Sequence, residues 1–168
     1  MPRPWTPWVG LLARLLLGGV LLAAGALKIG NLGESVNAVR GYQLLPWSLT
    51  VPVGYALPIL EIVVGLLLVV GLFTRWAALA GSLLMMAFII GIASAWARGI
   101  AIDCGCFGGG GAIALEAALA AYPWEIARDI GLLLCGAWLV WRPRTPFALD
   151  ERLSPSRRLR ASTTADRP

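Results

Sequence analysis

Residues 51–97 read VPVGYALPILEIVVGLLLVVGLFTRWAALAGSLLMMAFIIGIASAWA and contain only two charged side chains, Glu61 and Arg75. An apolar run of about 20 residues is long enough to cross the hydrocarbon core of a bilayer as a helix. The polar turn at Arg75 divides the stretch into two such runs, which predicts a helical hairpin made of spans 51–73 and 76–97. The stretch therefore places the chain in a membrane.

The rest of the chain adds two further spans. Residues 8–27 and 124–141 are also apolar runs of spanning length. The 168-residue chain is 58% hydrophobic and 14% charged, whereas a soluble domain is about 45–50% apolar and about 25% charged. Residues 8–27 have a signal-peptide interpretation, but the run is longer than a signal core and contains Arg14. We therefore expect an all-α polytopic membrane protein whose residues 1–141 form a four-transmembrane-helix bundle.

The basic residues are unevenly distributed and predict an orientation. Of the formal net charge of +5, most comes from residues 142–168, which hold seven arginines and three acidic residues. Positive charge beside a span is typical of the cytoplasmic side, so we expect both termini in the cytoplasm and both larger loops outside. The composition of residues 142–168 predicts a disordered tail, and we expect no nucleic-acid partner.

The candidate for chemistry is the loop that follows the third span, where residues 103–108 read DCGCFG. On the predicted orientation this loop faces the oxidising compartment. Cys104 and Cys106 are separated by one glycine, and such a pair can close a small, strained disulfide ring. Strained, exposed disulfides are the readily reduced, catalytic kind, so we expect these two cysteines to be the catalytic pair. The loop and hinge residues are Gly105, Phe107 and Gly108.

The same cysteines have structural interpretations. A bridge between Cys104 and Cys106 could be a static staple, although a bridge over one residue restrains little of the unfolded chain. A zinc site needs two further ligands and the chain contains no His, so we expect no metal. Cys135 lies inside the predicted fourth span, where a cysteine usually serves packing; a third redox role is the alternative.

Ionisable side chains within spans are costly and by default suggest function. Glu61 lies near the middle of its span and needs a cation, for which Arg14 is the natural candidate; the alternative for Arg14 is snorkelling to the interface. We expect Lys28, Arg128, Asp129 and Arg98 to join Glu61 in a charged pocket beneath the loop. This pocket either shapes the redox site and handles protons or locks the bundle.

The cysteine loop lacks an obvious activating field. A reactive cysteine usually lies at a helix N-terminus or beside a cation, but Cys104 follows a helix C-terminus and Asp103, and both oppose thiolate formation. We therefore expect nearby cations to fold over the thiols. The candidates are Arg98, Lys28, Arg40 and Arg128.

Several motifs, in their order and spacing, resemble the MauE branch of the DoxX-like, four-span redox-associated membrane proteins. They are GALK at 25–28, YQLLP at 42–46, PILE at 58–61, GLFTR at 71–75, DCGCFG at 103–108 and RD at 128–129. The resemblance implies a four-helix bundle in a bacterial cytoplasmic membrane. It also implies an association with maturation of the disulfide-rich small subunit of methylamine dehydrogenase, often alongside a thioredoxin-like protein. Similar proteins occur far beyond methylamine users, so that substrate is not carried over to this chain.

These observations lead to one principal hypothesis and three others. The principal hypothesis is a membrane thiol–disulfide redox protein that exchanges electrons with an extracytoplasmic thioredoxin-like protein through Cys104 and Cys106, and so supports disulfide maturation of exported proteins. The second adds a membrane quinone as cofactor. The third is a non-enzymatic assembly factor, and the fourth is a small transporter that uses Glu61. Whether the chain is an enzyme is therefore left open.

Overall fold

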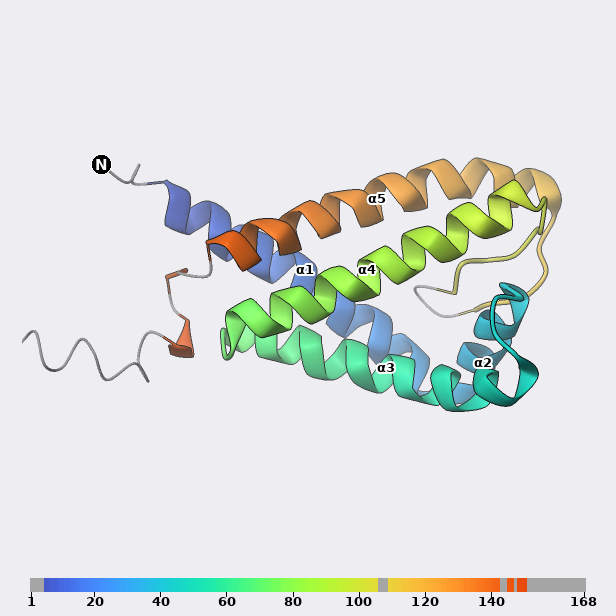
Figure 1. The fold of residues 1–168 in the computed structure, drawn as a ribbon, viewed down its shortest axis with the longest axis horizontal. Coiled ribbons are helices and arrows are strands. Elements are labelled where there is room, and N and C mark those ends of the chain that lie inside the picture. Colours follow the sequence, from blue (N-terminus) through green and yellow to red (C-terminus); the bar gives the residue numbers. More distant parts are fainter. Residues whose placement is uncertain (1–4, 106–108, 143–144, 147, 151–168) are drawn as a thin grey trace, which may run out of the picture.

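The computed structural model describes residues 5–105, 109–142, 145–146 and 148–150. Within these ranges the chain is all-helical, as predicted, apart from an isolated bridge between Ile102 and Ala112. The long helices pack lengthwise, with the short second helix and the loop between the last two helices at one end (Figure 1). The helices are α1 (Thr6–Ile29), α2 (Leu32–Gly41), α3 (Trp47–Val70), α4 (Thr74–Ala97) and α5 (Leu115–Trp141).

Three of these helices, α1, α3 and α4, are long and apolar enough to cross a membrane among the residues that the structure describes. Each has 24 residues, and large apolar side chains such as Leu83 and Leu66 remain exposed on their outer faces. Helix α5 is longer, with 27 residues, and lies beside α4. Helix α5 carries four charged residues, more than α1, α3 or α4. They are Glu116, Glu125, Arg128 and Asp129.

Two features of the helices differ from the predicted spans. Helix α5 begins at Leu115 and continues through Pro123, which the sequence placed at the start of the fourth span. The amphipathic helix α2 fills the first loop, which the sequence left without structure. Its Val36 packs so close to α3 that a Cβ on Gly54 would lie 2.6 Å from the Val36 side chain. The Ser35 hydroxyl donates to the Gly54 carbonyl oxygen at 2.8 Å.

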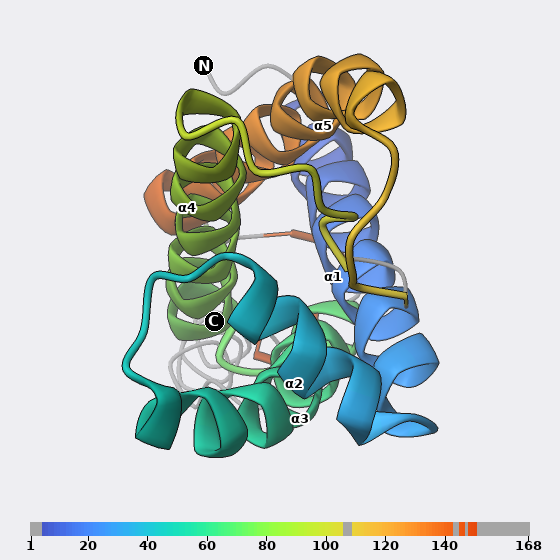
Figure 2. The same ribbon diagram turned by 90° about the vertical axis from the view of Figure 1, so that its right-hand side faces the viewer.

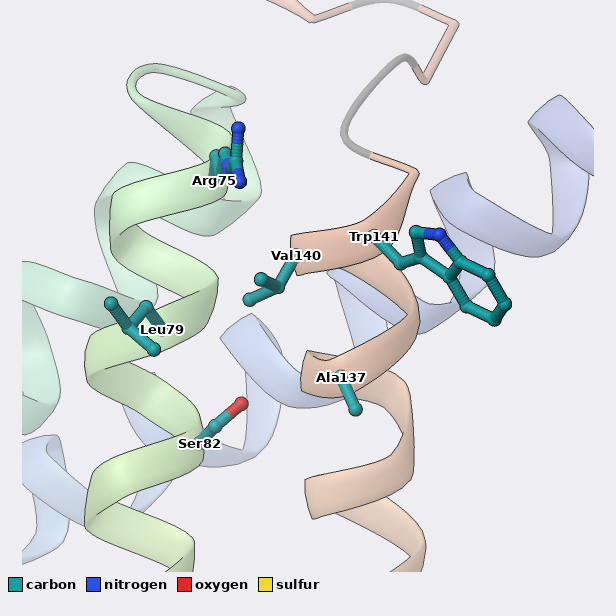
Figure 3. Close-up of a pocket in the computed structure, with 6 residues that line it drawn as sticks. All are labelled: Arg75, Leu79, Ser82, Ala137, Val140 and Trp141. Carbon is teal, nitrogen blue, oxygen red and sulfur yellow. The ribbon is translucent and has the colours of Figure 1, made fainter.

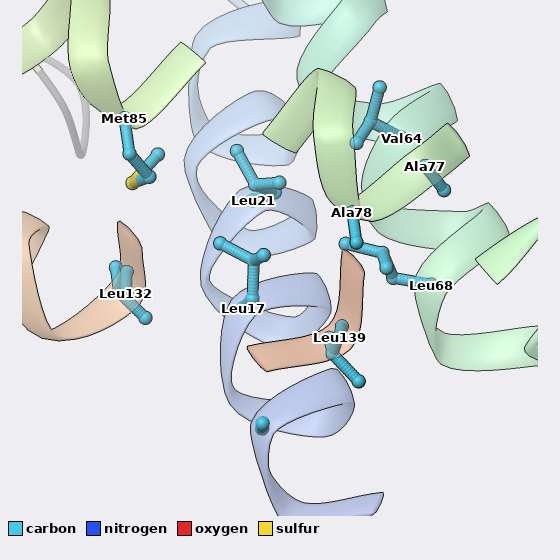
Figure 4. Close-up of a cluster of buried hydrophobic side chains, with 10 residues drawn as sticks. Leu17, Leu21, Val64, Leu68, Ala77, Ala78, Met85, Leu132 and Leu139 are labelled. Atoms are coloured by element: carbon cyan, nitrogen blue, oxygen red, sulfur yellow. The ribbon is translucent and has the colours of Figure 1, made fainter. Parts of the chain in front are cut away.

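Glycines bring α1 and α3 into close contact. A Cβ on Gly25 would lie 2.8 Å from the Pro58 carbonyl oxygen, and one on Gly65 would lie 2.8 Å from the Gly18 carbonyl oxygen. Small residues at a helix interface allow the backbones to approach, which is how helices gain packing energy in lipid. The apolar core beside this interface includes Leu17, Leu21, Val64, Leu68, Met85, Leu132 and Leu139 (Figure 4).

The described part of the C-terminal segment packs against the end of the bundle away from the cysteine loop. The Arg14 guanidinium donates to the Thr145 hydroxyl at 2.9 Å, and both residues are buried. The Asp150 carboxylate accepts hydrogen bonds from the backbone amides of Phe73 and Thr74, each at 2.8 Å. Asp150 therefore caps the start of α4 from a distant part of the chain. The packed region extends beyond the predicted boundary at residue 142.

These hydrogen bonds also set the charge state of Asp150. Although partial burial raises its pKa, the amides of Thr74 and Phe73 and the positive charge of Arg14 hold the pKa of Asp150 below its ordinary value. Residues 151–168, the remainder of the predicted tail, lie outside the described residues.

We expect Asp150→Asn to loosen this end of the bundle, because the Phe73 and Thr74 amides donate to different carboxylate oxygens and an amide offers only one acceptor oxygen. Loss of a capping interaction costs about 1 kcal/mol, which corresponds to a fall of about 2–4 °C in the thermal midpoint for a domain of this size. The contribution should be present above the ordinary aspartate pKa of about 3.9 and disappear as the pH falls through the lower folded-state value. Thermal unfolding in detergent at several pH values tests this. Glu34→Gln, an exposed acid on α2, is the control, and equal midpoints for the two variants would contradict the capping role.

Candidate functional site

The loop between α4 and α5 folds across one end of the bundle. Seen from that end, the loop dips towards α1 and returns to α5, with α2 crossing beside it (Figure 2). Its two arms are joined by hydrogen bonds from the Asp103 amide to the Gly111 carbonyl at 3.0 Å and from the Ile113 amide to the Ala101 carbonyl at 3.2 Å. The described arms of the loop, residues 98–105 and 109–114, are therefore paired with each other across the helix ends.

Tyr122 anchors this loop to α5. Its ring is fully buried, and its hydroxyl accepts from the Ile102 amide at 3.0 Å and donates to the Ile100 carbonyl at 2.7 Å. A buried tyrosine hydroxyl needs such partners, since an unpaired polar group in an apolar site is costly. Tyr122 therefore fixes the loop relative to the first turns of α5.

Cys104 lies on the inner side of the loop. Its side chain is 8% exposed and packs in a cluster with Ile92, Ala118 and Tyr122. Its carbonyl oxygen accepts a hydrogen bond from the Tyr42 hydroxyl at 2.9 Å. Its sulfur is therefore covered in this conformation.

Gly105 occupies a backbone conformation that other residues resist. Its φ is +64°, and a Cβ there would lie 2.7 Å from the Cβ of Ala38 on α2. The other members of the predicted motif, Cys106, Phe107 and Gly108, lie outside the described residues. The pairing of Cys104 with Cys106 therefore stays a prediction.

Two carboxylates lie beside the thiol. One oxygen each from Asp103 and Glu125 and the sulfur of Cys104 all lie within 4.8 Å of one another. Asp103 also accepts from the Gly105 amide at 3.3 Å, whereas the buried Oε2 of Glu125 has no hydrogen-bond partner among the described residues. A carboxylate next to a thiol can accept its proton. The same donor atoms are also metal ligands, so the lack of His that led us to expect no metal does not decide the question.

Glu125 was not recognised as a site residue from the sequence. A glutamate near the start of a predicted span does not by itself indicate a functional site. Glu125 lies next to the loop because Tyr122, one turn before it on α5, bonds to the loop backbone. A signal was available in principle, because Glu125 and the predicted Asp129 lie at i and i+4 on one face of a helix.

A buried ion pair lies deeper in the bundle. Lys28 Nζ on α1 and Glu61 Oε1 on α3 are 2.6 Å apart, and their side chains are 4% and 0% exposed. The Lys28 ammonium also lies 5.2 Å from the centre of the Phe88 ring. On α5, the Arg128 guanidinium contacts the Asp129 carboxylate at 2.8 Å.

Four of the five charged residues expected beneath the loop are brought together around a small cavity of about 10 Å³. Glu61, Arg128 and Asp129 line it, and Lys28 contacts Glu61 from α1. Glu61 Oε2 and Asp129 Oδ2 are buried and have no hydrogen-bond partner within the described chain. Because the two cations balance the two carboxylates, the cluster adds no net charge to the apolar interior.

The expected pairing of Arg14 with Glu61 is wrong. Arg14 lies beside Gly71, because a Cβ added to Gly71 would contact the Arg14 guanidinium. Arg14 donates its hydrogen bond to Thr145 instead of pairing with Glu61. Gly71 is ten residues beyond Glu61 on the α3 side, or roughly 15 Å along a helix. Lys28 is the partner because its long side chain reaches inwards from the end of α1.

Arg98 does not join the charged pocket and is exposed. Its guanidinium donates to the backbone carbonyls of Ser94 and Tyr42. Arg40 stacks on the Trp47 ring, 4.1 Å from its centre. Lys28 and Arg128 contact carboxylates. All four cations that were expected to fold over the Cys104 thiol are therefore engaged elsewhere. The Arg98 contact with Tyr42 supports the loop from outside, since Tyr42 in turn bonds to Cys104.

A larger cavity lies at the opposite end of the molecule, between α4 and α5 (Figure 3). Its volume is about 510 Å³. The residues that line it are Arg75, Leu79, Ser82, Ala137, Val140 and Trp141.

Comparison with known proteins gives a consistent result. The family model described as methylamine utilisation protein MauE matches residues 6–142. The methylamine utilization protein MauE of Paracoccus denitrificans is 33% identical over 109 residues, which cover 64% of this chain and 57% of that protein. The protein of the same name from Methylorubrum extorquens is 35% identical over 124 residues, covering 73% and 63%. The chain thus spans about three fifths of the length of these relatives, and no solved structure matches it.

We expect the Lys28–Glu61 pair to behave as a strongly coupled unit. Lys28→Met alone leaves Glu61 without its cation and should cost about 3–5 kcal/mol, as should Glu61→Gln in the presence of Lys28. The double variant should lose much less than the sum of the two. Thermal unfolding of the four proteins in detergent measures the coupling, and the cycle Arg128→Gln with Asp129→Asn provides a comparison with a pair whose arginine is partly exposed. Additive losses at Lys28 and Glu61 would show that the contact is not an ion pair in the folded protein.

Proposed function

This chain belongs to the MauE family and is a multi-pass membrane protein, and we propose that it is a membrane thiol–disulfide redox protein. In this proposal Cys104 and Cys106 exchange electrons with an extracytoplasmic thioredoxin-like protein and so support disulfide maturation of exported proteins. The observation that carries the proposal is the sulfur of Cys104 beside two carboxylates, on a loop that closes one end of a membrane helix bundle. The names of the relatives refer to methylamine utilisation. We include that role only as one setting for the proposed thiol–disulfide exchange.

The proposal includes α5 as a fourth span, with the cysteine loop outside and both termini in the cytoplasm. Helix α5 packs lengthwise beside α4, and its Arg128 and Asp129 neutralise each other by direct contact. A paired charge is far less costly in lipid than an isolated one. The seven arginines after residue 141 support the cytoplasmic placement of the end opposite the loop.

The exchange begins with transfer of the Cys104 thiol proton to the Glu125 carboxylate. The resulting thiolate attacks one sulfur of the partner's disulfide, forms a mixed disulfide and releases the other partner sulfur as a thiolate. The Cys106 thiolate, after losing its own proton, then attacks Cys104, which closes the Cys104–Cys106 disulfide and releases the second partner thiolate. Two electrons have passed to the partner, and the same steps in reverse return them.

The covered position of Cys104 requires the loop to move during exchange. The described arms of the loop are held by hydrogen bonds from the Tyr42 hydroxyl to Cys104, between Tyr122 and the backbone of Ile100 and Ile102, and between the arms themselves. Gly105, Gly109 and Gly110 have positive φ, a conformation that glycine adopts more readily than other residues. A partner that displaces the Tyr42 contact would expose the sulfur.

The quinone alternative receives less support from the geometry. The larger cavity is bounded by Leu79 on α4, whereas the cysteine loop follows Ala97 at the other end of that helix. Eighteen residues of helix correspond to about 27 Å, so a quinone in this cavity would not contact Cys104. A soluble protein that reaches the loop from outside is the simpler electron partner.

We expect Cys106→Ser to trap a mixed disulfide between Cys104 and its partner, because the resolving thiol is missing. Cys104→Ser should trap none through that sulfur, and Cys135→Ser should behave like the unmodified protein. Non-reducing electrophoresis after mild oxidation of whole cells, with mass spectrometry of the adduct, detects the complex. A Cys104, Cys106 double variant that keeps exported proteins fully oxidised would instead favour the non-enzymatic assembly factor.

Glu125→Gln should slow alkylation of reduced Cys104 by about tenfold or more at neutral pH, because general-base assistance is worth at least that much. The rate should recover as the pH rises and hydroxide replaces the missing base, a change that a purely structural role would not produce. Maleimide labelling of the Cys106→Ser, Cys135→Ser background isolates the Cys104 signal. Glu116→Gln, an exposed acid in the first turn of α5, is the matched control, and identical pH profiles for both variants would remove Glu125 from the mechanism.

A further inference from the structure

The cavity between α4 and α5 is an open groove with apolar walls (Figure 3). At its inner limit the helices touch closely, since a Cβ on Gly136 would meet the Ser82 hydroxyl oxygen. Towards the helix ends the walls are formed by Leu79, Val140 and Ala137. A volume of about 510 Å³ is within the range of about 300–1,000 Å³ that small-molecule sites occupy.

The groove lies at the depth of the lipid headgroups. Trp141 at its rim is 82% exposed, and Trp76 on the first turn of α4 is 70% exposed. Exposed tryptophans at the ends of spans are typical of the membrane–water interface. The groove therefore runs from the headgroup level into the acyl region, along the seam between two helices.

Arg75 stands at the mouth of the groove. It is exposed and makes no hydrogen bond or ion pair with any residue that the structure describes. An arginine guanidinium binds phosphate oxygens with two parallel hydrogen bonds, and a cation near an anionic membrane surface contributes about 1 kcal/mol. At the end of α5, Arg142 lies over the Trp138 ring, 5.8 Å from its centre, and adds positive charge to the same end of the molecule.

The geometry points to a binding site for an anionic phospholipid. Its phosphate would contact Arg75, and one acyl chain would lie along Leu79, Ala137 and Val140 as far as Ser82. This site is independent of the cysteine chemistry, because it lies at the other end of α4 and shares no residue with the loop.

Native mass spectrometry of the full-length protein, released from detergent with added lipid, tests the site. The probes are phosphatidylglycerol and phosphatidylcholine with identical acyl chains, and ubiquinone. We expect one phosphatidylglycerol to be retained in preference to phosphatidylcholine. Arg75→Gln should reduce that retention about fivefold, which corresponds to the interfacial contribution of one arginine, and Arg75→Lys should restore part of it.

A second variant separates the acyl contact from the charge. Ala137→Phe fills the groove from an exposed position and should displace the lipid while leaving thermal stability unchanged. Ala87→Phe, on an exposed part of α4 outside the groove, is the matched control and should retain the lipid.

Equal retention of the two phospholipids, unaltered binding in Arg75→Gln, preference for ubiquinone, or a dimer in place of bound lipid would each overturn the proposal. The Cys104→Ser, Cys106→Ser double variant should bind lipid normally, so failure of the redox proposal leaves this one standing.

Discussion

An ammonium group and a carboxylate meet at 2.6 Å inside an apolar bundle, and the arrangement of the helices depends on that contact. Moving an ion from water into an interior of low dielectric costs several kcal/mol, which only a partner in direct contact can offset. Because Lys28 is on α1 and Glu61 is on α3, the pair selects one register between these helices. A slip of one helical turn, about 5.4 Å, would separate the charges. The glycines at the α1–α3 interface make the register attainable because they allow the two backbones to come together.

The charged cluster also connects the bundle to the candidate redox site. Asp129 borders the same small cavity as Glu61, which ties α5, packed against α1 and α4, to the level of the charged cluster. One turn nearer the loop on α5 is Glu125, and one further turn holds Tyr122, whose hydroxyl anchors the loop backbone. The position of the Cys104 sulfur beside Glu125 is therefore a consequence of helix register, transmitted along a single rigid helix. The buried charges beneath the loop therefore have a structural role, which is to set the position of α5 and, through it, of the loop.

The all-helical membrane fold was predictable because apolar runs define the long helices. Lys28, Arg128 and Asp129 lie towards the same end of the bundle when the spans alternate in direction, and the long side chain of Lys28 reaches Glu61 near the middle of its helix. The identity of the pairs was not predictable, because Arg14 and Lys28 differ in reach and in the packing that only the folded chain supplies. Helix α2 was missed because it has only ten residues and its buried face consists of Ser35, Val36 and Ala38, so its amphipathic pattern is short. Glu125 was missed because its partner across the loop is set by one tyrosine anchor, a tertiary contact with no local signature.

The two ends of the α4–α5 pair have opposite chemical character, and this follows from how the helices are closed. At the loop end, the chain itself covers the helix termini with hydrogen-bonded backbone and gathers carboxylates around a thiol, Asp103 and Glu125 around Cys104. At the other end, the capping group for α4 is Asp150, and the described C-terminal residues cover the α3–α4 turn but do not line the groove between α4 and α5. An acidic site needs protection from the bilayer and access to water, whereas an apolar seam with an arginine at its mouth needs the reverse. Helices α4 and α5 meet both requirements because the α4–α5 loop covers one end of the pair, whereas the C-terminal segment at the other end covers the α3–α4 turn and not the groove.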